Sequence, residues 1–515
     1  MLQINKLTIN HLKDLRILIK DFSLTLNDGD KAAIIGEEGN GKSTLLKLIY
    51  DDNLVENYIQ YSGEIIKKGL KIGYLAQELD IDKKRLSVYE YCSLNDIFFN
   101  LLPNELAVIA KRLGIKNELF YSEQIMDSLS GGEKVKVQIA CILMEEPDIL
   151  LLDEPSNDLD IETIEWLQEF INSCKVPVLY ISHDEILLEN TANMIIHIEQ
   201  LKRKTESKIT IEHLGYSEFV ETRLRLLKHQ EQIARKERSD YEKQQEKFRQ
   251  IQQKVEHQQN VISRGDPHGG KLLKKKMHSI KSQQRRFEKE FENFTEIPET
   301  EEAMFVKFSE KTKMPNGKRV LNYENSLLKV KDKVLAEDIK LEIFGPRKVC
   351  IIGKNGVGKS TMLKEIASEM LKRKDINAYY MPQNYEDSLD LEKTPVEFLT
   401  CIGDKEENSK ICTYLASMKY TRNEMFHKIG ELSGGQKAKL LFLKMTMGNY
   451  DVLLLDEPTR NFSPLSNPVI INILQEFKGT IISVSHDRKY IKEVCDTVYE
   501  LTKQGLNEIN NDEFN

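Results

Sequence analysis

The chain has 515 residues, of which 40% are hydrophobic and 30% charged, and it carries a formal net charge of −8. This length exceeds what one hydrophobic core normally spans, so we expect two or three globular domains. No apolar run approaches the ~18 residues of a membrane helix, and Lys6, Lys13, Asp14 and Arg16 stand where a signal peptide carries its apolar core. We therefore expect a chain that neither spans a membrane nor follows the usual secretory route.

The seven cysteines are scattered and never spaced as CxxC, which favours neither a disulfide framework nor a zinc site and fits a reducing, cytoplasmic setting. The net charge conceals an asymmetry. Residues 221–290 contain 19 Lys and Arg against 10 Asp and Glu, which leaves a charge of −17 on the rest of the chain. A basic segment in an acidic protein indicates contact with a polyanion.

In chain order, the first predicted element with a motif is the strand KAAIIG, which leads into the loop GEEGNGKST and a leucine-rich helical pattern. In a GxxxxGK[ST] loop, glycines let backbone N–H groups surround phosphates, Lys42 reaches the β- and γ-phosphates, and Ser43 ligates Mg²⁺. The pattern recurs around GKNGVGKST, with Lys359 and Ser360, so we expect two nucleoside triphosphate sites. The predicted loop residues are Gly36, Gly39, Gly41, Lys42, Ser43 and Thr44, and Gly353, Gly356, Gly358, Lys359, Ser360 and Thr361.

The next motif-bearing strand is ILLLDEP, which delivers Asp153 to its carboxyl end. A carboxylate there holds hydrated Mg²⁺, and Glu154 is placed to orient or deprotonate the attacking water. His183 follows a later apolar strand, 30 residues after Asp153, and we expect it to sense the γ-phosphate. The corresponding residues of the second copy are Asp456, Glu457 and His486.

An internal repeat is established by the spacing of these motifs. The Walker-type loops recur at an offset of 317 residues, and LSGG, LLLDEP and SHD all recur at an offset of 303. Three motifs that hold one register over about fifty residues predict two homologous domains. We expect an α/β fold, with domains at residues 1–205 and 301–515.

Together with Gln77, Gln383, LSGGE and LSGGQ, these motifs resemble the ATP-binding-cassette superfamily over some 400 of the 515 residues. The resemblance implies an ATPase with two P-loop cassette domains that pair head to tail, within one monomeric chain. Each Walker loop would then face the SGG motif of the other domain, because that motif opens a helix whose N–H groups can complete a γ-phosphate cage. The SGG residues are Ser130, Gly131 and Gly132, and Ser433, Gly434 and Gly435.

The two copies differ directly after DEP. The first reads SNDLD, as the D-loop of the superfamily usually does, whereas the second reads TRNFS and places Ser463 where the first has Asp160. We therefore expect two kinetically unequal sites. No convincing aromatic residue precedes either Walker loop, so the sequence leaves the base selectivity open.

Residues 206–300 are predicted to form a basic helical hairpin between the domains. A first helix is expected at 216–262, a turn with Pro267 and three glycines at 263–270, and a second helix from Lys271. The narrow 4-3-4-3 spacing of apolar positions predicts a packed seam. Its expected members are Leu273, Met277, Ile280, Gln284 and Phe287 on the second helix, and Phe248, Ile251, Val255 and Ile262 on the first.

The outer face of the hairpin is rich in cations. Between Lys271 and Lys281 there is no acidic residue, so charge is not neutralised locally, which favours RNA phosphate contact over a merely solvated coiled-coil surface. Such contacts position a protein without reading sequence. The expected RNA-contacting residues are Arg264, Lys271, Lys274, Lys275, Lys276, Lys281, Arg285 and Arg286.

Two fused cassettes with a charged helical linker and no membrane domain resemble the ABC-F family of translation factors. The resemblance implies a cytoplasmic, ribosome-associated ATPase that uses ATP and Mg²⁺ and contacts rRNA and P-site tRNA near the peptidyl-transferase centre. TRNFSPLSNP at 459–468 and the compact second helix resemble the branch that protects ribosomes against pleuromutilins, lincosamides and group A streptogramins. The alternatives are a general ABC-F translation factor, the nucleotide-binding subunit of an exporter, and a DNA-repair or chromosome-structuring ATPase.

Overall fold

The computed structural model describes residues 1–201, 204–261, 267–290, 295, 308, 314–330 and 333–509. Residues 1–216 and 301–515 form one compact unit, which contains both cassettes, and residues 217–300 form a second. Each unit is described by itself.

Both cassettes are built on a six-stranded sheet with the same strand order, and within each sheet only the last strand is antiparallel. The central strands are apolar and fully buried, as is typical of parallel sheets covered by helices on both faces. In spatial order the first sheet contains β5 (Ile72–Leu75), β6 (Ile149–Asp153), β7 (Val178–Ile181), β3 (Lys31–Ile35), β8 (Met194–Leu201) and β9 (Glu206–Glu212). The second contains β13 (Ala378–Met381), β14 (Val452–Asp456), β15 (Thr480–Val484), β12 (Lys348–Ile352), β16 (Thr497–Thr502) and β17 (Gly505–Ile509).

The matching sheets confirm the predicted α/β fold with two cassettes. Each cassette also has an antiparallel sheet that packs over its Walker helix through a shared apolar cluster. In the first cassette this sheet has the order β2 (Ile17–Leu26), β1 (Leu2–His11) and β4 (Ile59–Ile66), and in the second it consists of β10 (Arg319–Val330) and β11 (Lys333–Phe344).

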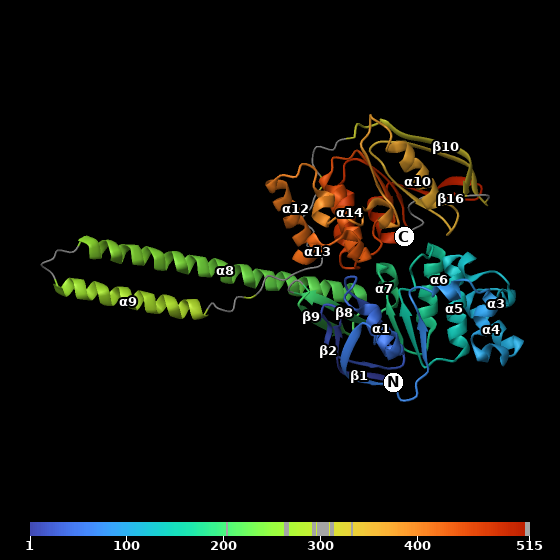
Figure 1. Cartoon of the computed structure of the whole chain (residues 1–515), viewed down its shortest axis with the longest axis horizontal. Coiled ribbons are helices and arrows are strands. Elements are labelled where there is room, and N and C mark those ends of the chain that lie inside the picture. Colours follow the sequence, from blue (N-terminus) through green and yellow to red (C-terminus); the bar gives the residue numbers. More distant parts are fainter. Residues whose placement is uncertain are drawn as a thin grey trace. The chain divides into compact units, whose positions relative to one another are not determined.

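Seven α-helices are described in each cassette, and several of them are labelled in Figure 1. The helices of the first cassette are α1 (Lys42–Tyr50), α2 (Ile81–Lys84), α3 (Val88–Ser93), α4 (Pro103–Leu113), α5 (Gly131–Met144), α6 (Ile161–Ser173) and α7 (Glu185–Thr191). Those of the second are α10 (Lys359–Met370), α11 (Pro395–Leu399), α12 (Lys405–Ser417), α13 (Arg422–Phe426), α14 (Gly434–Met447), α15 (Asn467–Glu476) and α16 (Arg488–Val494). Short 3₁₀ turns lie at Asp52–Leu54, Asp96–Phe99, Asn117–Tyr121, Met126–Ser128, Tyr385–Ser388 and Ile429–Glu431.

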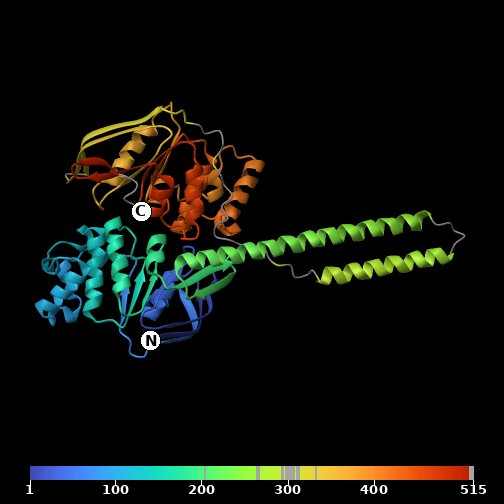
Figure 2. The same cartoon turned by 180° about the vertical axis from the view of Figure 1, so that it is seen from behind.

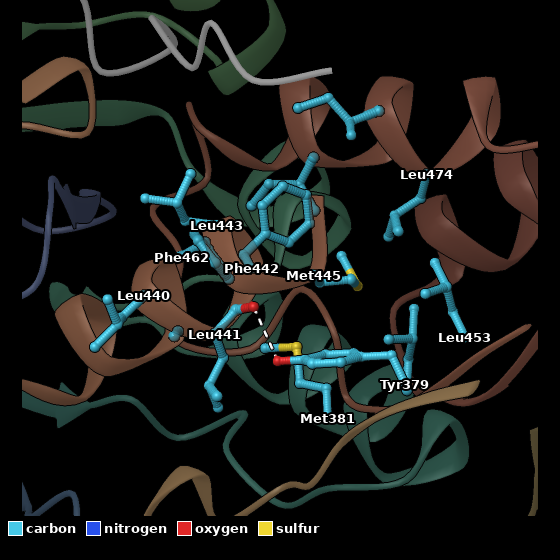
Figure 3. Packing of buried hydrophobic residues seen from close by; sticks show 14 of the residues in the cluster. Tyr379, Met381, Leu440, Leu441, Phe442, Leu443, Met445, Leu453, Phe462 and Leu474 are labelled. Carbon is cyan, nitrogen blue, oxygen red and sulfur yellow. Dashed lines mark hydrogen bonds between the residues drawn. The ribbon is translucent and has the colours of Figure 1, made fainter. Parts of the chain in front are cut away.

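The core of the second cassette shows how packing positions a site element (Figure 3). Tyr379 on β13 is buried, and its hydroxyl donates a 3.0 Å hydrogen bond to the carbonyl of Leu441 on α14. Phe442 on the same helix meets the buried ring of Phe462 edge to face, with centroids 6.1 Å apart. The LSGG helix and the segment after LLLDEP therefore share one core.

The boundary expected at residue 205 falls inside a hairpin. Strand β9 pairs with β8 from Glu206 to Glu212, so the first cassette continues through this strand and residues 206–212 do not belong to the helical linker. The pattern of Ile209 and Ile211, which pack against the cassette core, explains why the strand is retained there.

The linker contains two helices, α8 (Tyr216–Val261) and α9 (Pro267–Glu290), which lie side by side and antiparallel in Figure 1 and in the reverse view of Figure 2. The second helix begins at Pro267 rather than at Lys271, because proline is well tolerated in the first turn of a helix, where its missing N–H costs nothing. Residues 267–270, expected in the turn, are therefore helical. Ile262 and Arg264 lie outside the described residues.

The predicted seam is largely confirmed. Val255, Ile280 and Phe287 are buried, and the ring of Phe287 stacks on Tyr241 at 5.3 Å and meets Phe248 at 5.7 Å. Ile251 is 44% exposed, so its place in the seam was predicted wrongly. Tyr241, seven residues before Phe248, is the aromatic partner that the spacing analysis missed.

Candidate functional site

Both Walker loops end in a glycine that caps the following helix in the left-handed region, Gly41 with φ 91° and Gly358 with φ 108°. A side chain at these positions would strain the backbone, so glycine lets successive N–H groups point into the loop. The lysine ammonium groups close the loops: Lys42 donates to the Gly36 carbonyl at 2.7 Å, and Lys359 donates to the Gly353 carbonyl at 2.7 Å. These are anion-binding loops of the predicted kind.

The Walker aspartates lie where predicted, at the ends of β6 and β14. The Ser43 hydroxyl donates to Asp153 Oδ1 at 2.9 Å, and the Ser360 hydroxyl donates to Asp456 Oδ1 at 3.2 Å. Burial raises the pKa of both aspartates to about 6, although the serine hydrogen bonds oppose the shift.

A hydroxyl and a carboxylate oxygen fit Mg²⁺, which keeps several waters and takes its remaining ligands from substrate phosphates. Among the described residues, no group of three or more His, Cys, Asp or Glu side chains could hold a metal. This donor set suits a cation that arrives with the nucleotide. Ser43 with Asp153, and Ser360 with Asp456, would hold it.

The glutamates that follow are held in an unusual backbone conformation. Glu154 has φ 50° and Glu457 has φ 52°, both in the left-handed region. For a residue with a side chain this costs about 1–2 kcal/mol, and such strain concentrates at functional sites. The same strained conformation occurs in both copies, directly after the Walker aspartate.

The SGG motifs open helices, as predicted. Ser130 and Ser433 cap α5 and α14, and each forms a capping box with the residue three positions later, Glu133 or Gln436. Gly132 packs so closely on Thr163 that an added Cβ would lie 2.7 Å from its hydroxyl. The N-terminal N–H groups of both helices are thus fixed at the surface of their cassettes.

The second Walker loop and the first SGG helix line one cavity of about 610 Å³. Asn355 of the loop donates to the Asp158 carbonyl of the first cassette, close to Gly131. Val330 and Leu335 line the same cavity, and both are aliphatic, in keeping with the lack of an aromatic residue before the Walker loop. Predicted residues on its wall are Gly131, His183, Gly356, Gly358, Lys359, Ser360, Thr361, Gln383, Glu457 and His486.

The first Walker loop faces the second SGG helix across a space of only about 20 Å³, lined by Glu37, Glu38, Ser433, Gly435 and Lys439. Glu37 and Lys439 form a 2.6 Å ion pair there, with side chains only 11% and 12% exposed. The structure therefore brings together both head-to-tail pairs that the sequence predicts.

The glutamate of the first site is tightly held. Glu154 accepts hydrogen bonds from Gln77 at 3.0 Å and from Asn157, and His183 Nε2 lies 3.4 Å from its other oxygen. Burial alone would raise the pKa of Glu154, but the contact with His183, supported by Lys42, outweighs it and lowers the pKa to about 2. His183 Nδ1 lies 2.7 Å from the Phe462 carbonyl of the second cassette, which orients the ring.

The second site holds its glutamate through longer contacts. Glu457 accepts longer hydrogen bonds, from the Ser485 hydroxyl at 3.4 Å and the His486 N–H at 3.3 Å, and His486 Nε2 lies 3.8 Å from its other oxygen. Burial, with the charge of Asp456, raises the pKa of Glu457 to about 8, and burial with Lys359 lowers the pKa of His486 to about 3. His486 Nδ1 is buried and has no hydrogen-bond partner within the described part of the chain.

The D-loops, residues 156–160 and 459–463, also differ between the two copies. Asp160 caps α6 by accepting from the Thr163 N–H at 3.0 Å, whereas Ser463 is bonded to the Ser466 hydroxyl and α15 begins only at Asn467. Arg460 forms a 2.9 Å ion pair with Asp158 of the opposite D-loop.

Sequence reasoning missed Asn157, Asp158 and Arg460, although all three lie in the motif that it singled out. Gln383 lies on the wall of the second-site cavity, as predicted, and its amide is also 3.4 Å from Asp158 of the first cassette. Only the pairing of the cassettes brings these groups together, so no spacing rule within one cassette could have found them.

Further cross-cassette contacts join α16 to α7 and to α6. Lys489 donates to Glu185 at 2.8 Å, and Arg488 lies 3.5 Å from Glu165. At matched positions after SHD the first cassette carries Glu185 and the second Arg488, so the two copies are electrostatically complementary.

This contact predicts a pH dependence of stability. Burial raises the pKa of Glu185 to about 7 despite its bond to Lys489, whereas an unfolded glutamate titrates near 4.3. Its contribution is therefore fully present below about pH 4 and is lost as the pH rises to about 7. Thermal unfolding of wild type and Glu185→Gln should differ in slope between pH 5 and 7, by on the order of 2 kcal/mol in total. Parallel curves for the two proteins would contradict this assignment.

The predicted RNA-contacting cations can be placed on the second unit. Seven of the eight have described, exposed side chains on α9, which is consistent with a face open to a polyanion: Lys271, Lys274, Lys275, Lys276, Lys281, Arg285 and Arg286. Among the described residues, no helix is both long enough and apolar enough to cross a bilayer.

Two P-loop cassettes, each with its Walker loop facing the SGG helix of the other, are typical of an ATPase of the ATP-binding-cassette class. In agreement, the model of the ABC transporter family matches residues 19–157 and 336–460, and the chain belongs to this family. Its cassettes bind ATP, and the protein is an ATPase.

The relatives refine this assignment. The chain is 27% identical to ABC transporter F family member 5 of Arabidopsis thaliana, over 94% of this chain and 72% of that protein. It is 28% identical to the ribosome protection protein VmlR of Bacillus subtilis, over 96% of this chain and 86% of that protein. These similarities extend along nearly the full length of this chain.

The solved structures support the fold. Archaeal ribosome recycling factor aABCE1, in a complex with the stalk protein aP1, matches with a TM-score of 0.58 and 16% identity, over 97% of this chain and 89% of that one. A structure of RNase-L Inhibitor matches with a TM-score of 0.57 and 17% identity, over 97% and 89% of the two chains. At this identity the likeness concerns the arrangement of two cassettes.

Proposed function

We propose that this protein is a ribosome-binding ABC-F ATPase in which ATP draws the two cassettes together and thereby controls how the basic hairpin engages RNA. Its partners are rRNA and P-site tRNA near the peptidyl-transferase centre, in the cytoplasm. The finer part of the proposal is that this action relieves inhibition by ribosome-targeting antibiotics.

The observation that carries the proposal is the run from Lys271 to Lys281 on α9, whose lysine side chains are exposed and which contains no acidic residue. The helix of a solvated coiled coil would be stabilised by pairs of opposite charge along its surface, such as the pair of Arg235 and Glu231 on α8. The cations of this run are instead available to phosphates. The similarity to VmlR, which is named a ribosome protection protein, supports the ribosome as the source of those phosphates.

The arrangement of the nucleotide sites would let bound ATP hold the two cassettes together. The N-terminus of an SGG helix attracts the γ-phosphate of ATP bound to the opposite Walker loop, so the triphosphate bridges two surfaces that the diphosphate cannot bridge. Glu154 and Glu457 orient or deprotonate the attacking water, and His183 and His486 sense the γ-phosphate. Mg²⁺, when bound, neutralises charge that develops on the phosphates. Hydrolysis removes the bridge, and the cassettes separate.

Substitution of Lys274, Lys275 and Lys276 by Gln is expected to weaken ribosome binding about tenfold or more, because three phosphate contacts are removed from a helix that keeps its seam. The plot of log affinity against log salt should lose about 2–3 units of slope, which sedimentation with ribosomes at graded salt would measure. The matched control removes three cations of α8 that are paired along their own helix, Arg235, Lys243 and Arg249, and should change little.

Sedimentation with ribosomes also distinguishes this function from the alternative of an exporter subunit. Binding of the intact protein to membranes rather than ribosomes, whatever the nucleotide, would favour an exporter subunit. Drug susceptibility separates the finer alternatives: cells with the intact gene should resist pleuromutilins, lincosamides or group A streptogramins, and cells with the triple lysine variant should not. Ribosome binding without any change in susceptibility would identify a general ABC-F translation factor instead.

A further inference from the structure

The two Walker loops carry opposite charges at positions that do not take part in the GxxxxGK[ST] pattern. The first loop reads Glu37 and Glu38 after its opening glycine, and the second reads Lys354 and Asn355. Two carboxylates in a loop that binds a triphosphate would repel the phosphates, so we asked what these carboxylates contact instead.

Glu38 contacts the opposite cassette. Its carboxylate accepts a hydrogen bond from the backbone N–H of Gly435, in the first turn of α14. An added Cβ on Gly434 would lie 3.2 Å from the other Glu38 oxygen, so the carboxylate lies directly over the first turn. The neighbouring pair of Glu37 and Lys439, at 2.6 Å and nearly buried, holds the loop against this helix.

An anion is stabilised at such a place, because the N–H groups of the first turn lack partners within the helix and carry a partial positive charge. In the proposed composite site, this is the place of the γ-phosphate. The Glu38 carboxylate and the γ-phosphate are therefore two anions with the same binding partner, and only one of them can use the Gly435 N–H.

The second site provides an internal comparison. Asn355, the counterpart of Glu38, is neutral and donates to the Asp158 carbonyl instead of covering the helix N-terminus. The cavity beside it has a volume of about 610 Å³ and reaches Gly131. In the first site, Glu38 instead lies beside Ser433 and Gly435, and all three line one small space.

We propose that Glu38 is an intramolecular competitor of the γ-phosphate at the first composite site, which lowers the preference of that site for ATP over ADP. This proposal rests on the proposed function, since it requires that the SGG helix binds the γ-phosphate across the cassettes. The second site, with Asn355, loads ATP first, and the first site closes only when triphosphate displaces Glu38.

The test is photolabelling of the full-length protein with azido-ATP and azido-ADP, followed by cleavage between the cassettes to show which one is labelled. Glu38→Gln keeps the shape of the side chain and removes its charge, so the ATP-over-ADP preference of the first cassette should rise about tenfold. Asn355→Glu should lower the preference of the second cassette by a similar factor. Glu37→Gln is the matched control, because it removes the same charge one residue away and loses the bond to Lys439, so it should not raise the preference.

An unchanged or lowered preference in Glu38→Gln, or an equal gain for ATP and ADP, would overturn the role of Glu38. The proposed composite site is tested separately with Ser433→Arg in the second cassette, which should lower ATP labelling of the first. No effect of Ser433→Arg would defeat the composite site itself. A lowered labelling in that variant, together with no effect of Glu38→Gln, would defeat only the competitor.

Discussion

Replacing Glu154 and Glu457 together by Gln is expected to lower ATP hydrolysis by about 10²- to 10⁴-fold, the usual contribution of a positioned general base. ATP binding should persist, because the amide keeps the size of the side chain and neither Walker lysine is changed. The bridge between the cassettes then survives, so the variant should accumulate on ribosomes in ATP, measured by cosedimentation beside the wild type.

The single variants provide the control for the double one. Glu154 is held by Gln77, Asn157 and His183, whereas Glu457 has longer hydrogen bonds to Ser485 and His486 and a longer contact with the His486 ring. Because the environments differ, Glu154→Gln and Glu457→Gln should not lower hydrolysis by the same factor. If the double variant binds ribosomes less than wild type in ATP, the closed form is not the one that binds, and the clamp mechanism fails.

Gly353→Ala should abolish nucleotide binding at the second site. Gly353 has φ 142°, and an added Cβ would lie 2.5 Å from the Leu501 carbonyl on β16, a backbone atom that cannot yield without moving the sheet. The loop must shift instead, which carries the Lys359 ammonium away from the phosphates. Overpacking of this kind also costs about 1–3 kcal/mol of stability, in addition to the left-handed strain.

Gly356→Ala is the matched control for this prediction. Gly356 also has a positive φ, 77°, but an added Cβ would meet nothing within 4 Å in the described structure. It should cost only the strain of about 1–2 kcal/mol and weaken ATP binding modestly. Equilibrium binding of fluorescent ATP and thermal unfolding would measure both variants, and equal losses in the two would contradict the role of the Leu501 carbonyl.

Local sequence determined much of this protein. The Walker loops, the Walker aspartates and the SGG helix starts lie where their motifs predict, because glycine conformations, helix caps and strand ends are set by neighbouring residues. The repeat at an offset of 303 likewise predicted two sheets with one topology. The hairpin was predicted from periodicity, with an error at Pro267 and another at Ile251, where the packing of two helices decides exposure.

Tertiary structure decided what distinguishes the two sites. The bond of His183 to the Phe462 carbonyl, the ion pair of Arg460 with Asp158, and the position of Glu38 on the first turn of α14 all join residues separated by hundreds of positions. Each depends on the pairing of the cassettes, which places charges and carbonyls across a shared surface. No motif within a single cassette contains that information, since the same residues would face water if the cassettes were apart.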